Sequence, residues 1–133
     1  MKKLILLALL SSFSLVSCLE NENSIVSTST IDLFAGILPD TVIVNSTTPI
    51  SLRATAPNSC WHSIRFRKET IRDTLTNFWA IGTFENHGEV CNDVLVTKDT
   101  VINLIPTATK SYIFQFLENY NKVRVDTIVV VAE

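Results

Sequence analysis

Three cysteines are the residues whose chemistry can be argued most directly from their positions. Cys18 ends an N-terminal stretch with Lys2 and Lys3 and then a short apolar run, which is the pattern of a secretory signal. Cys60 and Cys91 lie in the body of the chain. In an exported protein these two form an even pair in an oxidising compartment, so we predict a disulfide bond between them. Two buried free thiols are the alternative.

The residues immediately before Cys18 form a short motif. Leu15 stands three positions before the cysteine and the small Ser17 directly precedes it. This stretch resembles the lipobox of bacterial lipoproteins, and the resemblance covers residues 1–18 only. It implies that residues 1–17 are a cleaved signal peptide and that Cys18 carries lipid on its sulfur and on its new amine. Ordinary signal cleavage and an N-terminal membrane helix are the alternatives, but the apolar run is shorter than the roughly 20 residues that a spanning helix needs.

Cleavage before Cys18 leaves a chain of modest size and weak charge. Of the 133 residues 116 remain, which is enough for one domain. The full chain has eleven Lys and Arg against thirteen Asp and Glu, and loss of two lysines leaves nine against thirteen, a net charge of −4. This balance provides no positive field for nucleic acid. The expected membrane contact is the lipid on Cys18.

Residues 18–39 are predicted to be the lipidated N-terminus and a flexible tether, because Ser, Thr and Asn dominate their first part. The apolar residues 31–38 suggest that the end of the tether docks on the domain. Glu20 and Glu22 resemble the surface-export signal of certain Gram-negative lipoproteins, and Leu19 is not the aspartate that is associated with inner-membrane retention. The expected location is the outer membrane, with the periplasmic and cell-surface faces both open.

Residues 40–133 are predicted to form an all-β domain. Short alternating runs rich in Val, Ile, Thr and Phe are separated by turn signals about every ten residues. The expected fold is a two-sheet antiparallel β-sandwich of seven to eight strands. The last two runs, which carry an aromatic and a valine face, are the most core-like. The predicted strands cover residues 41–45, 50–54, 60–68, 74–85, 90–97, 101–105, 111–118 and 122–132.

This architecture resembles the immunoglobulin fold, but only at the level of its layers. Cys60 and Cys91 are 31 positions apart, closer than the cysteine pair of antibody domains, and Glu89 stands where those domains have the tyrosine of the tyrosine corner. The resemblance therefore transfers no functional residue.

Catalytic and metal-binding patterns were sought and not found in the sequence. His62 and His87 have no H-x-x-x-H or C-x-x-C partner, and G-x-S-x-G, S-x-x-K and glycine-rich phosphate loops are absent. We therefore expect no metal, no cofactor apart from the lipid, and no enzymatic activity. A site built from loops leaves little trace in one sequence, so an enzyme with an unrecognised site stays as an alternative.

One strand carries the best candidate for a binding face. Alternation places Trp61, Arg65 and Arg67 opposite Ile64 and Phe66, so an indole and two guanidinium groups are expected to face outward together. Such groups recur at binding hot spots and suit an anionic glycan or an acidic loop of an envelope protein. The alternative is structural, since arginines on a sheet also discourage edge pairing.

The sequence thus predicts a lipid-anchored, non-catalytic lipoprotein of the outer envelope that acts as a binding or accessory module. An inhibitor or assembly factor for an envelope protein is the main alternative, and an enzyme with a loop-built site is the second. The ligand and the oligomeric state stay open.

Overall fold

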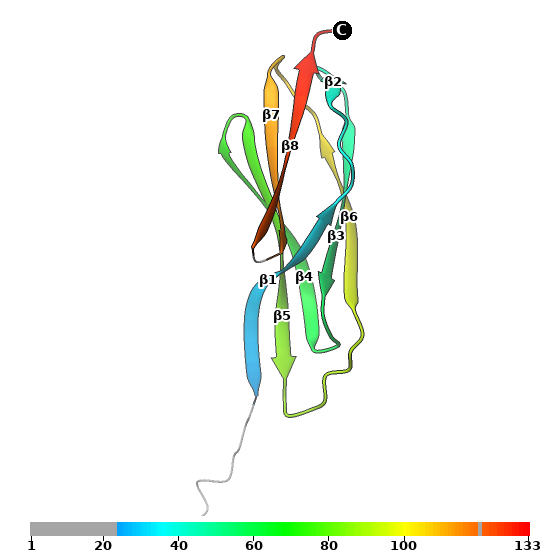
Figure 1. Cartoon of the computed structure of the whole chain (residues 1–133), viewed down its shortest axis with the longest axis vertical. Coiled ribbons are helices and arrows are strands. Elements are labelled where there is room, and N and C mark those ends of the chain that lie inside the picture. Colours follow the sequence, from blue (N-terminus) through cyan, green and yellow to red (C-terminus); the bar gives the residue numbers. More distant parts are fainter. Residues whose placement is uncertain (1–23, 120) are drawn as a thin grey trace, which may run out of the picture.

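The computed structural model of the protein describes residues 24–119 and 121–133, and within them the chain forms strands and no helix (Figure 1). The prediction of an all-β fold is confirmed. The strands in chain order are β1 (Ile25–Ala35), β2 (Thr41–Ile43), β3 (Thr48–Ala56), β4 (Trp61–Arg72), β5 (Leu75–Asn86), β6 (Val96–Leu104), β7 (Ser111–Asn119) and β8 (Lys122–Val131).

The eight strands belong to one curled sheet, open like a half-barrel, with the order β2-β8-β7-β5-β1-β3-β6 and with β4 paired to β5. The expected pair of separate sheets is not confirmed, because β1 joins the two halves of the sheet. Residues 25–31 of β1 pair with β5, and residues 32–35 pair with β3. The expected antiparallel arrangement also needs correction, since the β2–β8 and β5–β7 ladders are parallel.

The presence of β1 corrects the predicted tether of residues 18–39. Residues 25–35 are a paired strand of the domain, and Ile31 and Leu33 are buried in the core at 4% and 0% exposure. The Ser and Thr residues that suggested a linker also suit a strand, since the Thr28 hydroxyl lies 3.4 Å from that of Thr83 on β5. The domain therefore begins well before residue 40.

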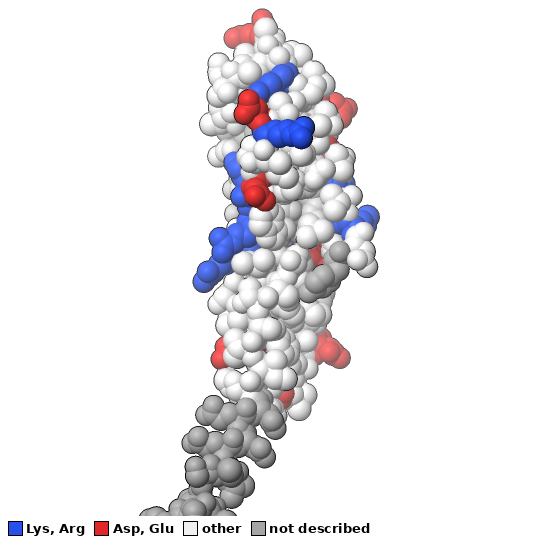
Figure 2. Space-filling model, turned by 90° about the vertical axis from the view of Figure 1, so that its left-hand side faces the viewer, with Lys and Arg blue, Asp and Glu red and all other residues white. Residues whose placement is uncertain are grey.

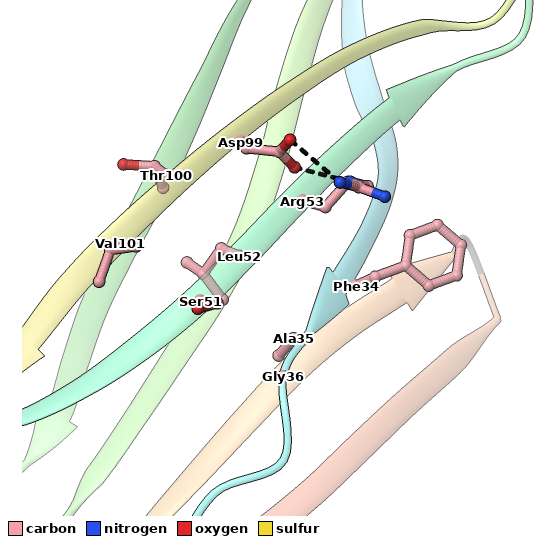
Figure 3. Close-up of a pocket in the computed structure, with 9 residues that line it drawn as sticks. All are labelled: Phe34, Ala35, Gly36, Ser51, Leu52, Arg53, Asp99, Thr100 and Val101. Carbon is pink, nitrogen blue, oxygen red and sulfur yellow. Dashed lines mark hydrogen bonds and ion pairs between the residues drawn. The ribbon is translucent and has the colours of Figure 1, made fainter.

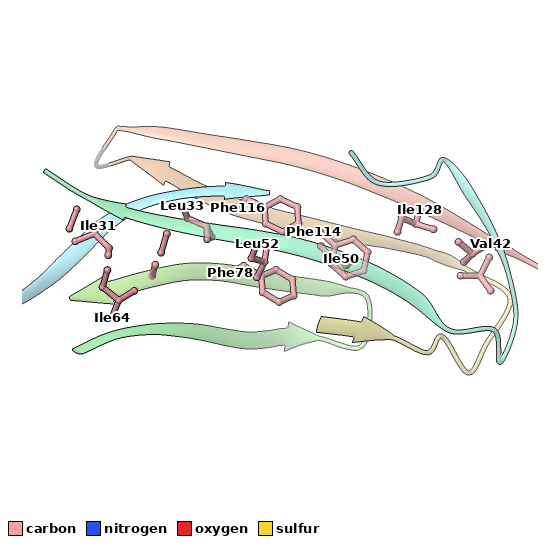
Figure 4. Close-up of a cluster of buried hydrophobic side chains, with 14 residues drawn as sticks. Ile31, Leu33, Val42, Ile50, Leu52, Ile64, Phe78, Phe114, Phe116 and Ile128 are labelled. Carbon is pink, nitrogen blue, oxygen red and sulfur yellow. The ribbon is translucent and has the colours of Figure 1, made fainter. Parts of the chain in front are cut away.

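Period-two alternation explains most of the core. In β3 every second residue from Thr48 to Ala56 is buried, and β5 buries Thr76, Phe78, Ala80 and Gly82 in the same way. Figure 4 shows the buried apolar side chains meeting between β3 and the strands β5, β7 and β8. Phe78 stacks on Phe116 with ring centroids 5.2 Å apart. The buried apolar residues are Ile31, Leu33, Val42, Ile50, Leu52, Ala54, Ala56, Ile64, Phe78, Ala80, Phe114, Phe116, Ile128 and Val130.

The more apolar face of β8 points outward, which is the reverse of what hydrophobicity alone predicts. Ile128 and Val130 point into the core, whereas the valines at odd positions are exposed. The inner positions also hold Arg124, which lies over the Phe116 ring at 5.1 Å and donates hydrogen bonds to the carbonyl oxygens of Ala35 and Gly36 at 2.8 and 2.9 Å. These partners allow a cation to occupy an inward position.

The sixth strand also differs from the predicted pattern. The predicted strands at residues 90–97 and 101–105 are replaced by a loop at residues 87–95 and by a continuous β6, which includes Lys98 and Asp99. Lys98 donates a hydrogen bond to the Ile64 carbonyl oxygen at 2.9 Å, and Asp99 pairs with Arg53. Lys98 and Asp99 can therefore lie inside β6, because each has a polar partner on another strand.

Candidate functional site

The disulfide bond between Cys60 and Cys91 is present, as predicted. It does not join two strands, because Cys60 lies in the turn after β3 and Cys91 lies in the loop before β6. Ser59 and Asn92 add two hydrogen bonds between the same segments, at 3.0 and 2.9 Å. The bridge therefore fixes the position of the long loop at one end of the domain.

A β-bulge separates Trp61 from Arg65 and Arg67, so the predicted face of these three side chains does not exist. Ser63 has φ of 52°, and the register of β4 against β5 shifts by one residue between His62 and Arg65. A shift of one residue moves a side chain to the other face of a strand. Trp61 is half-buried against the core, edge-on to Phe84 with centroids 5.6 Å apart.

The same shift leaves the two arginines beside a different tryptophan. Arg67 pairs across the ladder with Trp79 of β5, and Arg65 pairs with Ile81. Trp79 is half-buried, and both arginines are exposed. The outer face of β4 and β5 thus combines an indole with two guanidinium groups. Alternation within β4 could not predict the contribution of Trp79, because this residue lies on β5.

A second polar cluster surrounds Glu85 near the disulfide bond. His62 Nε2 lies 2.7 Å from Glu85 Oε2, and His87 Nε2 lies 2.8 Å from Glu85 Oε1. Hydrogen bonds from His87 and His62 lower the pKa of Glu85. His62 Nδ1 also lies 2.9 Å from Ser63 Oγ. Within the described residues, no three His, Cys, Asp or Glu side chains are arranged to hold a metal ion.

The largest cavity that we describe is a groove of about 620 Å³ on the outer side of β1, β3 and β6 (Figure 3). Phe34 of β1 is 52% exposed and pairs across the ladder with Arg53 of β3. Arg53 forms two hydrogen bonds to Asp99 of β6, at 2.7 and 3.1 Å. These bonds raise the pKa of Arg53 and lower that of Asp99. The lining residues are Phe34, Ala35, Gly36, Ser51, Leu52, Arg53, Asp99, Thr100 and Val101.

The groove offers an aromatic face next to a fixed pair of opposite charges. The Arg53 and Asp99 side chains hold each other in place and still expose about 60% of their surface, so free donor and acceptor positions remain. Sequence reasoning missed this site because its members are 19 and 46 positions apart and Phe34 was assigned to the tether. The pairing of β3 with its two neighbours is what brings them together.

Charge is unevenly distributed along the molecule. In the side view of Figure 2, Lys and Arg atoms lie in the upper and middle parts, and the lower part shows only acidic atoms among the charged ones. Acidic residues at this end include Glu85 and Glu89, close to the disulfide-linked loop. On the face shown in Figure 2, the Lys and Arg groups thus lie away from the end where β1 begins.

Comparison with known proteins gives no family. No family model matches the chain, and neither a curated protein nor a solved structure matches it. Cys18, the predicted lipidation site, lies outside the described residues. Between residue 24 and residue 133, with residue 120 left aside, no helix is long and apolar enough to cross a membrane.

Proposed function

We propose that the protein is a lipid-anchored, non-catalytic binding module of the outer envelope, and that the groove beside Phe34 binds a glycan. The observation that carries the proposal is the combination of an exposed aromatic ring with the hydrogen-bonded Arg53–Asp99 pair in the largest cavity described. A concave site with a few fixed polar groups is the usual form of a small-ligand site. The anchor at Cys18 rests on the lipobox, and the Gram-negative outer-membrane location rests on Leu19, Glu20 and Glu22 that follow it.

A sugar ring has the chemistry that this groove offers. One face of a pyranose carries C–H groups that stack on an aromatic ring, and its hydroxyl groups donate to a carboxylate and accept from a guanidinium group. Asp99 supplies the acceptor and Arg53 the donors, and Phe34 supplies the ring. Because the two charged side chains already bind each other, little ordering is needed when a ligand arrives.

Replacing Phe34 with alanine is expected to weaken glycan binding about tenfold, since loss of a central aromatic contact commonly costs more than about 1 kcal/mol. Asp99→Asn should weaken binding as well, by removing the charge-assisted acceptor. The measurement is a glycan array followed by calorimetry with the best ligand. Arg65→Gln with Arg67→Gln is the matched control on the other face.

The arginine variant distinguishes the groove beside Phe34 from the outer face of β4 and β5 as the binding surface. If the arginine variant loses the ligand and Phe34→Ala keeps it, the binding face is the one formed by Arg65, Arg67 and Trp79, and the groove is not the site. If the array captures no glycan for the parent protein, the glycan assignment is wrong. Unchanged melting of each variant is required for either conclusion.

Metabolic labelling tests the anchor. With a clickable fatty acid, the parent chain should be labelled and Cys18→Ala should lose essentially all label, because two or three acyl chains are needed for stable attachment and all are expected at this residue. Cys60→Ala is the matched control and should keep its label. Equal labelling of parent and Cys18→Ala would remove the anchor from the proposal.

The alternative function is an inhibitor or assembly factor for an envelope protein. The indole and two arginines on the outer face of β4 and β5 support it, since such groups recur at protein interfaces. The finer fold description, an immunoglobulin-like sandwich, is likewise a proposal. It is supported by the facing of β3 against β5 and β7 around one core.

A further inference from the structure

The outer face of β7, β8 and β2 is unusually apolar for an exposed surface. Val123 and Val125 are 51% and 54% exposed, and Val129, Val131, Ile43 and Ile113 are also exposed. The ladder registers place these side chains on one face, because Val131 pairs with Ile43, Val125 with Gln115 and Thr127 with Ile113. We call this surface the valine face, defined by Ile43, Ile113, Leu117, Val123, Val125, Thr127, Val129 and Val131. Thr41, Ser111 and Gln115 are uncharged polar residues on the same side, since they pair with Val129 and Val125.

An exposed apolar face of this size is expected to be covered by a binding partner. Strands that are apolar on both sides are typical of sheets that are covered on both sides, and contiguous apolar patches of several hundred Å² mark interaction sites. Inside the protein, Ile128 and Val130 of β8 already face the core. Within the described residues, no segment of the chain covers the opposite side of this strand.

We propose that the valine face is the interface of a symmetric homodimer, in which the same face of a second copy packs against it. In a two-fold contact each group near the axis meets its own copy, so a charged side chain there would meet a like charge. None of the eight residues of the face is charged. Two such faces of mainly β-branched side chains can pack as the sheets of a sandwich do, about 10 Å apart.

The size of the face fits a weak dimer. A strand rise of about 3.4 Å per residue and a strand spacing of about 4.8 Å give a face about 27 Å long and about 10–15 Å wide, widest where the three residues of β2 join β8. Two copies would then bury about 550–800 Å² in total, which is the range of weak contacts. We expect a reversible dimer that lipid anchoring would favour by raising the local concentration. The dimer does not depend on the glycan groove.

Cysteine cross-linking in the full chain tests the dimer. Thr127 lies at the centre of the valine face, and Thr97 lies on the outer side of β6, paired with Thr55. Both are exposed strand threonines, so Thr97→Cys is a matched control for Thr127→Cys. Under mild oxidation in intact envelopes, Thr127→Cys should give at least ten times more covalent dimer on a non-reducing gel.

A second change makes the test independent of the reactivity of one thiol. Val125→Lys with Val129→Lys, added to Thr127→Cys, should abolish the dimer band, and the melting of this variant must match that of the parent. No dimer from Thr127→Cys, or equal dimer from Thr97→Cys, would overturn the proposal. A mixed disulfide with a protein of another mass in place of the dimer would also overturn it, and would assign the face to a different partner.

Discussion

A chain that begins at Asp40 is expected to be unfolded, although it contains the whole domain as the sequence alone would delimit it. It lacks β1, which pairs with both β5 and β3 and brings Ile31 and Leu33 into the core. Loss of two buried aliphatic side chains costs about 2–5 kcal/mol each, and a domain has only about 5–15 kcal/mol of stability. Far-UV circular dichroism and the dispersion of the amide NMR spectrum measure the outcome.

The control for this experiment is a chain that begins at Ser24, which keeps β1 and should unfold cooperatively. Leu33→Ala in that chain should lower the free energy of unfolding by about 2–5 kcal/mol, because Leu33 is fully buried. Cooperative unfolding of the chain that begins at Asp40 would show that β1 is dispensable.

Removal of the disulfide bond should lower the free energy of unfolding by about 3–4 kcal/mol. Cys60 and Cys91 are 31 positions apart, and in the chain-entropy model a loop of this length gives a stabilisation of that size. The double variant Cys60→Ala, Cys91→Ala avoids a leftover thiol. Urea unfolding monitored by tryptophan fluorescence is suitable, since Trp61 follows the bridge directly and is half-buried.

Reduction of the parent protein gives an independent value for the same bond. The reduced parent and the double variant should agree, and both should keep the strand content of the oxidised protein, because the bridge joins a turn to a loop outside the strands. A loss below about 1 kcal/mol would contradict the entropic account.

Alternation was a good guide where one face of a strand is buried and polar residues occupy the other. In the predicted strand at residues 50–54, the alternate residues Ile50, Leu52 and Ala54 share one face, and all three are buried. The rule failed in two ways. β1 carries Ser and Thr at residues 27–30 and resembles a linker, although Thr suits a strand. In β8 the more apolar face is the outer one, so hydrophobicity alone predicts the wrong orientation; the inward Arg124 is accommodated by its contacts with β1 and with Phe116.

The candidate sites depended even more on long-range pairing. The face of Trp61, Arg65 and Arg67 was derived from strict alternation, and a single bulge at Ser63 moved the indole to the inner side. A bulge leaves no clear signal in one sequence, because Ser is tolerated at ordinary strand positions as well. The groove could not be predicted because it requires knowledge of which strands flank β3. The cysteine pair was predicted correctly because its evidence was the compartment, not the fold.

The path of β1 has a mechanical consequence. The chain leaves the domain at the start of β1, at the end opposite the C-terminus (Figure 1). A lipid anchor at Cys18 would transmit any pull on the domain through residue 24 and along the axis of β1. Seven register pairs with β5 and four with β3 would then be loaded together in shear, and could not open one at a time like a zipper. The strand that completes the core is thus also the one that would resist tension between the membrane and whatever the domain holds.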